Sequence, residues 1–152
     1  DQAVYAYARE DADWWEKELS QSIANGRFGE NLTTSGIDVN GALVGERWKI
    51  GTTILEVSQP RIPCRVFAGF WQRPTLIKEF MASGKPGTYL RIIQEGHINA
   101  GDEIEVISKP AHNVSIADLY AAKNGERSKV EEIAAVKELS AKYQEWAQSL
   151  RS

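Results

Sequence analysis

The sequence contains very few of the residues that form disulfides and metal sites, with one cysteine and two histidines among 152 residues. A single cysteine cannot form a disulfide within the chain. Neither His97 nor His112 has a cysteine or a second histidine at zinc-ligand spacing. We therefore expect no structural zinc site, and we expect both histidines to be surface or turn residues.

The chain also lacks a strong excess of charge of one sign and any long apolar run. A formal net charge of -3 and a pI near 5.5 argue against general binding to nucleic acid or to an anionic membrane surface. No apolar run is long enough to span a bilayer, and the chain does not open with a secretory pattern. We expect no nucleic-acid or membrane partner and a cytoplasmic protein.

What is present is enough apolar sequence for one main domain, because 42% of the residues are hydrophobic and 9% are aromatic. Alternating and β-rich runs predict strands, whereas an acidic start predicts a helix that ends near Asn25 and Gly26. The predicted strands lie at 3–7, 53–57, 89–93 and 104–107, with a further strand at Ile98.

The pattern changes to a helical period after Pro110. We expect a helix over 75–82 earlier in the chain, a helix over 115–122, and a further helix that begins at a capping box formed by Ser128 and Glu131. The last segment has an apolar stripe formed by Tyr143, Trp146, Ala147 and Leu150. The sequence thus predicts a β domain over 1–110 and a three-helix segment over 111–152. That segment either covers the β domain or recruits a partner.

The stretch VSQPRIPCRVF holds the single cysteine, Cys64. Free cysteines are most often small buried hydrophobic residues, which is one interpretation of this thiol. Pro60 and Pro63, however, indicate a shaped loop after the strand at 53–57. Arg61 and Arg65 favour the thiolate if either side chain folds toward the sulfur. The alternative interpretation is a rigid loop that presents a nucleophile or a soft-metal ligand.

A second stretch, NGRFGENLTTSG, combines glycines with short polar side chains and one arginine. Gly26 and Gly29 permit a close backbone approach, and Arg27 offers a planar donor group suited to phosphate. Asn31 and Thr33 add hydrogen-bonding groups. The pattern is compatible with a small anionic ligand or with a simple turn, since it lacks the spacing of a phosphate-binding loop or a dinucleotide fingerprint.

The motifs GRFGENLTTSGID and NGALVGERWKIGTTILEVSQPRIPC together resemble the MOSC domain family, named for the C-terminal domain of molybdenum cofactor sulfurase. The start AVYAYAREDADWW and the helical tail are similar to the bacterial subgroup linked to 6-N-hydroxylaminopurine resistance. The resemblance implies a mainly β fold with flanking helices, in which a MOSC-type β-barrel is followed by a short C-terminal helical segment. Relatives usually have further strands before the segment matched by 1–4, and we expect the domain over 1–110 to lack them.

The resemblance also implies the site. Its cofactor would be the molybdenum cofactor, a molybdopterin, and Cys64 would be the catalytic residue and the molybdenum ligand, or would carry sulfur. The residues implied to hold the cofactor are Arg27, Gly29, Asn31, Thr33 and Arg61, with Arg27 the candidate for its phosphate.

The function implied by the resemblance is reduction of N-hydroxylated bases or related small molecules. The sequence has no dinucleotide fingerprint, flavin signature or iron–sulfur cysteine set, so a partner reductase protein is expected to donate the electrons. One alternative is a sulfur or cofactor carrier that uses a Cys64 persulfide. Another is a cofactor-binding domain without catalysis. A homodimer is left open.

Overall fold

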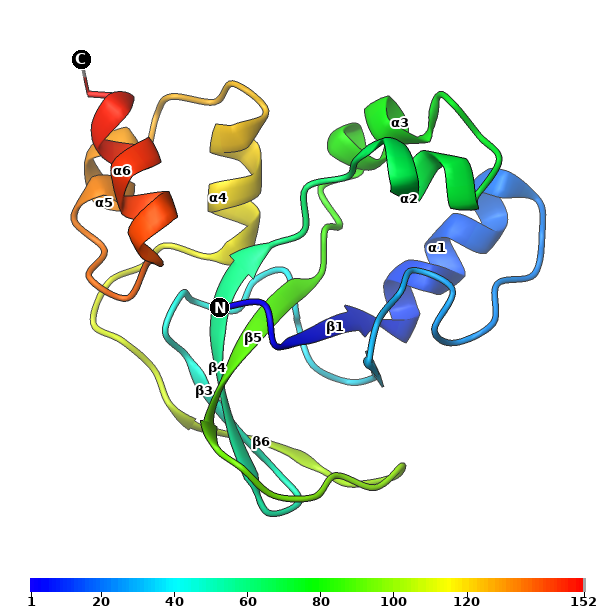
Figure 1. The fold of residues 1–152 in the computed structure, drawn as a ribbon, viewed down its shortest axis with the longest axis horizontal. Helices are drawn as coiled ribbons and strands as arrows, with labels where there is room; N and C mark the ends of the chain where they lie inside the picture. The colour runs from blue at the N-terminus through cyan, green and yellow to red at the C-terminus, as the bar shows by residue number, and fades with distance from the viewer. Residues whose placement is uncertain (152) are drawn as a thin grey trace.

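The computed structural model describes residues 1–151, which form one sheet with helices around it (Figure 1). The strands are β1 (Val4–Ala8), β2 (Leu32–Thr34), β3 (Arg47–Ile50), β4 (Thr53–Pro60), β5 (Thr88–Gln94) and β6 (Ile104–Ser108). The helices are α1 (Arg9–Leu19), α2 (Arg65–Phe70), α3 (Leu76–Ser83), α4 (Ile116–Lys123), α5 (Val130–Ala134) and α6 (Ala141–Ser149).

The six strands have the order β2-β1-β5-β4-β3-β6. β1 and β2 are parallel, and the remaining neighbours are antiparallel. The sheet curls, and residues of both edge strands line one cavity of about 390 Å³. In the described part of the chain, the two edge strands β2 and β6 do not pair with each other, so the sheet does not close into a barrel. The mainly β fold with flanking helices is therefore confirmed, as a curled half-barrel.

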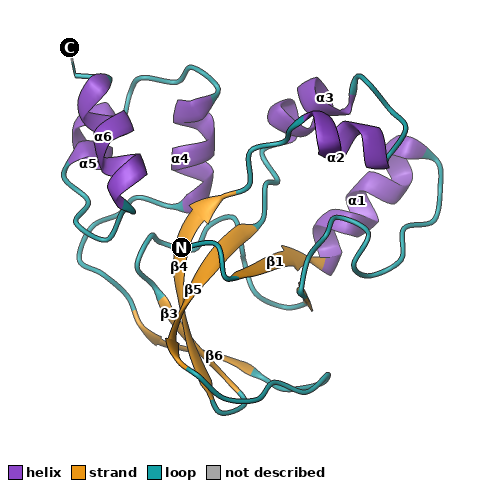
Figure 2. Ribbon diagram, in the orientation of Figure 1, coloured by secondary structure: helices purple, strands orange, loops and turns teal. Residues whose placement is uncertain are grey.

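The helices form two groups on the two sides of the sheet (Figure 2). α4, α5 and α6 contribute to a core cluster that is shared with β3, β4 and β5 and that includes Trp48, Leu55 and Leu119. α1, α2 and α3 surround a second, largely aromatic cluster that includes Tyr7 and Phe80. This second cluster supports the loops that carry the candidate site.

The strands predicted from β-rich runs are confirmed, whereas the strand at Ile98 is wrong. Ile98 lies in the irregular segment between β5 and β6. Alternation alone could not place this segment, because a strand also needs a hydrogen-bonding neighbour. The predicted end of the first helix near Gly26 is also wrong. The helix ends at Leu19, because Ser20 adopts the left-handed conformation (φ 52°) and its N–H donates to the Glu16 carbonyl.

The helical predictions were partly confirmed. Ser115 and Asp118 form a capping box at the start of α4. The capping box predicted for Ser128 and Glu131 is wrong, because the Ser128 N–H donates to the Glu126 carboxylate and α5 begins after Lys129. The apolar stripe of the last helix is confirmed, since the Tyr143 and Ala147 side chains are buried.

Helix α2 was not predicted, because the sequence indicated only a loop around Cys64. None of the helices in residues 1–151 has the length and apolar character needed to cross a bilayer.

Candidate functional site

The sheet order brings two distant loops to the same end of the molecule. Pro60, at the end of β4, pairs with Thr88 of β5, and Thr88 pairs with Ala6 of β1. β1 and β4 therefore run in the same direction on either side of β5. The segment that follows β4 carries Cys64, and it emerges beside β1 and the loop that leads into β2.

The loop over 25–31 is a tight glycine turn tied to its surroundings. Gly26 and Gly29 have positive φ angles of 88° and 81°, and the Gly29 N–H donates to the Gly26 carbonyl at 2.9 Å. At the end of the loop, the Asn31 N–H donates to the Tyr5 carbonyl, and the Asn31 Oδ1 accepts from the Tyr5 N–H at 2.8 Å. Asn31 thus fixes the turn onto β1.

Phe28 anchors this turn in the aromatic cluster. Its side chain is 1% exposed, with its ring centroid 4.3 Å from that of Tyr7 and 5.0 Å from that of Trp71. Phe67 and Phe80 also pack around it. Truncating such a buried ring costs about 3–5 kcal/mol, so the position of the turn is strongly specified.

Arg61 joins the two loops. Its Nη1 donates to the Phe28 carbonyl at 2.5 Å, and its Cζ lies 4.7 Å from the centre of the Phe67 ring and 5.2 Å from that of Tyr5. A Cβ added to Gly29 would lie 3.1 Å from the Arg61 Nη1, so a glycine leaves room for this guanidinium. Arg61 and Gly29, both predicted site residues, are therefore in contact.

Arg27 extends from the same turn over the C-terminal end of α2. Its Cζ lies 4.5 Å from the ring centre of Phe70 and 4.8 Å from that of Trp71. No carboxylate in residues 1–151 forms an ion pair with Arg27. Stacking holds the face of the guanidinium, whereas its N–H edges stay available to an anion.

Cys64 is exposed and stands at the N-cap position of α2. Its exposure disagrees with the interpretation of the thiol as a buried hydrophobic residue. The preceding residue, Pro63, is buried, and Phe67 and Ala68 anchor the helix that follows. The thiol is thus presented at the surface by a segment that is fixed on both sides.

Asn31 and Thr33 line a cavity that Arg27, Arg61 and Cys64 do not. Thr33 is in the edge strand β2, and its hydroxyl donates to the Glu30 carboxylate at 3.0 Å. Both residues line the cavity between β2 and the segment before β6. The structure therefore divides the predicted residues into two sets. Asn31 and Thr33 line this cavity, whereas the residues around α2 are Arg27, Gly29, Arg61 and Cys64.

The contribution of α2 to the site was not predicted from the sequence. Phe67, Phe70 and Trp71 form the surfaces on which the two arginines stack. The aromatic residues that follow Cys64 were a usable signal. The Trp71 Nε1 is buried without an acceptor in residues 1–151, so this donor is unpaired next to Arg27.

Tyr5 contributes a buried neutral hydroxyl beneath Arg61. Burial raises the pKa of Tyr5 well above its ordinary value, although the Arg61 guanidinium acts in the opposite direction. The hydroxyl donates to the Pro86 carbonyl at 2.5 Å. Because Tyr5 stays neutral, its hydroxyl does not compensate the positive charge of Arg61.

The arrangement is suited to binding an anion beside a thiol. Two arginines reach the surface around a glycine turn, and the exposed Cys64 stands three residues after Arg61. Among residues 1–151, no three His, Cys, Asp or Glu side chains are grouped closely enough to hold a metal ion by themselves. A metal held here would have to arrive with a cofactor that supplies its other ligands.

Comparison with known proteins identifies relatives of this chain. It is 31% identical over 116 residues to the uncharacterized protein YflK of Bacillus subtilis (strain 168), an alignment that covers 76% of this chain and 52% of YflK. It is 30% identical over 95 residues to a protein named Reductase from Gibberella moniliformis, covering 62% of this chain and 17% of that protein. The chain thus spans about half of YflK and a smaller part of the reductase.

The fold also matches a solved structure. The crystal structure of YiiM from Geobacillus stearothermophilus superimposes with a TM-score of 0.92 and 32% sequence identity, covering 99% of this chain and 79% of that one. The MOSC domain family matches residues 1–105, which include both motif loops. On this evidence the chain belongs to the MOSC domain family, which is associated with molybdenum cofactor binding.

Proposed function

We propose that this chain holds the molybdenum cofactor of a reductase that acts on N-hydroxylated bases or related compounds. The observation that carries the proposal is the contact between the two motif loops, in which Arg61 bonds the Phe28 carbonyl beside Gly29 and Cys64 is exposed close by in sequence. The name Reductase of the Gibberella moniliformis relative supports the reaction class.

The residues of the site fit an anionic, phosphate-bearing cofactor. Arg27 has no ion-pair partner in residues 1–151, and its stacking on Phe70 and Trp71 fixes the direction of its donors. Arg27 would bind the phosphate through paired charge-assisted hydrogen bonds. Arg61 would add positive charge at the turn, and Asn31 would keep the turn in place by its bonds to Tyr5.

When bound, the molybdenum cofactor would supply the redox chemistry. The overall reaction breaks the N–O bond of the substrate, takes up two electrons and two protons, and releases the amine and water. The electrons would come from a partner reductase protein, and the protons from solvent. The chain itself would provide the Cys64 thiolate as the metal ligand and the arginines as the cofactor cradle.

The deciding experiment is metal and pterin analysis of protein made in a cofactor-competent host, together with reduction assays on an N-hydroxylated purine. Wild type is expected to retain molybdenum and pterin, and Cys64→Ser to lose turnover while its melting temperature stays unchanged. Protein that is free of metal and takes up no added cofactor would contradict the proposal. Full turnover by Cys64→Ser would exclude ligation by the thiolate.

The exposure of Cys64 also favours a second candidate, a sulfur or cofactor carrier that uses a persulfide, because a carrier thiol must reach its acceptor. Intact-protein mass distinguishes the two candidates. A sulfur adduct that is lost on reduction and absent from Cys64→Ser would support the carrier, whereas a cofactor-loaded protein without the adduct would support the reductase.

A further inference from the structure

Helix α2 and the segment just before it expose an apolar ridge, which the Arg27 guanidinium partly covers at Phe70. The ridge consists of Ile62, Val66 and Phe70, which are 40%, 80% and 59% exposed. Val66 and Phe70 are spaced four apart and share one face of the helix, and Ile62 lies in the segment just before the helix. Large apolar side chains exposed together on one element indicate an interaction surface.

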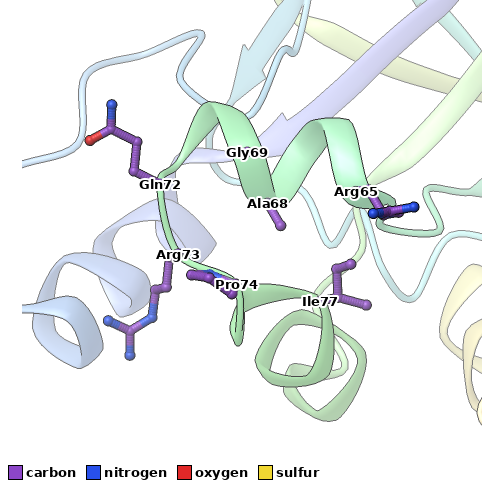
Figure 3. Close-up of a pocket in the computed structure, with 7 residues that line it drawn as sticks. All are labelled: Arg65, Ala68, Gly69, Gln72, Arg73, Pro74 and Ile77. Atoms are coloured by element: carbon purple, nitrogen blue, oxygen red, sulfur yellow. The ribbon is translucent and has the colours of Figure 1, made fainter.

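A cavity of about 530 Å³ lies beside this ridge, between α2 and α3 (Figure 3). Ala68, Pro74 and Ile77 face the space between the helices, whereas the side chains of Gln72 and Arg73 turn outward. The cavity is large enough to accept an aromatic or aliphatic side chain. A pocket of this kind next to an apolar ridge is typical of a protein interface, where one buried anchor supplies much of the affinity.

The charge around the ridge is positive, although the whole chain has a net charge of -3. The segment over 61–75 contains Arg61, Arg65 and Arg73 and no acidic residue. Arg73 is neutralised by Glu79 at 2.7 Å, but Arg65 is exposed and has no ion-pair partner in residues 1–151. Such a surface is complementary to an acidic partner that carries an apolar anchor.

We infer that the α2 ridge and the adjacent cavity form the docking surface for an acidic electron-carrier protein, an inference that rests on the proposed reductase function. That reaction consumes two electrons, and the sequence carries no motif for an electron-donating cofactor of its own. α2 begins at the residue after Cys64, and Arg27 of the cofactor cradle stacks on Phe70 of the ridge. A carrier docked here therefore brings its redox group close to the site, as short-range electron transfer requires.

The test uses reduced flavodoxin, a small acidic flavoprotein, as the donor, and reduced methyl viologen as a small donor that needs no docking surface. The test variant is Val66→Glu, which places a carboxylate at the centre of the ridge. The matched control is Val106→Glu; Val106 is 38% exposed, and its strand, β6, lies well away from α2 (Figure 1). Turnover of an N-hydroxylated purine and the binding of oxidised flavodoxin are measured for wild type and both variants.

Val66→Glu is expected to raise the KM for flavodoxin and to weaken flavodoxin binding about tenfold or more, because a buried like charge opposes an acidic partner. Its viologen-driven turnover and the flavodoxin kinetics of Val106→Glu should match wild type. Wild-type flavodoxin turnover should also fall as salt is raised.

Equal flavodoxin kinetics and binding in all three proteins, or no flavodoxin binding by wild type, would overturn the docking inference. Failure of viologen to drive wild-type turnover would instead count against the proposed reductase, and the binding measurement would still decide the docking surface.

Discussion

The guanidinium of Arg61 donates to the carbonyl of Phe28, 33 residues earlier in the chain, at 2.5 Å. This bond joins the proline-flanked loop after β4 to the glycine turn before β2. It sets the geometry of the candidate site, because Arg61 fills the space that a side chain at Gly29 would occupy.

Replacing Gly29 by alanine tests this contact. Gly29→Ala is expected to lower the free energy of unfolding by about 1–2 kcal/mol through its positive φ, and also to displace Arg61. Gly26→Ala is the matched control, because Gly26 has a similar φ but no atom within 4 Å of an added Cβ. Urea unfolding should show a loss of stability in both variants, and the loss should be larger in Gly29→Ala, because displacing Arg61 also weakens its bond to the Phe28 carbonyl. Cofactor retention should fall only in Gly29→Ala, and equal retention would show that the Arg61 contact has no role in binding.

The role of Arg27 can be separated from its packing by Arg27→Lys. Lysine cannot reproduce the planar geometry by which arginine makes paired hydrogen bonds to a phosphate. If Arg27 holds the cofactor phosphate in this way, the variant loses one charged hydrogen bond of about 1.5–3 kcal/mol, and its affinity for the cofactor falls roughly ten- to hundredfold. The fold should remain intact. Arg65→Lys serves as the control, because Arg65 is an exposed arginine of α2 and not of the glycine turn. Titration of cofactor and melting curves without ligand check the prediction, and unchanged affinity with a lowered melting point would remove Arg27 from the site.

The hydroxyl of Tyr7 is expected to support the aromatic cluster. It accepts from the Trp15 Nε1 at 3.0 Å and donates to the Lys85 carbonyl at 2.9 Å. Tyr7→Phe leaves a buried indole N–H without an acceptor, which costs about 1–3 kcal/mol. Tyr5→Phe is the comparison, because it removes a single donation to the Pro86 carbonyl and should lower stability less. Chemical denaturation of both variants measures the two losses of stability. Equal losses would contradict the explanation that Tyr7→Phe leaves the Trp15 N–H without an acceptor.

Asp11 is expected to make stability depend on pH. Burial raises its pKa, opposed by the hydrogen bond that Asn40 donates at 2.7 Å. The folded state therefore holds the Asp11 proton more tightly than the unfolded state. The resulting stabilisation is present below about pH 4 and is lost as pH rises through the raised pKa.

The variant Asp11→Asn removes this titration. Its stability relative to wild type should increase as pH rises from about pH 4 toward neutrality. Urea unfolding of both proteins across this range measures the difference, and parallel curves would show that the burial of Asp11 has no energetic effect.

Local patterns in the sequence were sufficient for much of the fold. The β-rich run at 53–57 and the run at 104–107 became parts of β4 and β6, because β-branched residues favour the extended backbone of a strand. Helix α2 was missed for a physical reason. It is only six residues long and contains Gly69, so it is stabilised chiefly by burying Phe67 and Ala68 against other elements.

The sequence by itself determined the chemistry available to the site: a single thiol behind a proline, arginines on either side, and a glycine turn with its own arginine. Only the tertiary structure decided which of these groups meet. The strand order places β5 between β1 and β4, and this brings Arg61 to Phe28 and leaves Thr33 on the edge strand β2. Contacts between residues so far apart depend on how the strands pair and on how the aromatic cluster packs, and neither is encoded in the local spacing of the two motifs.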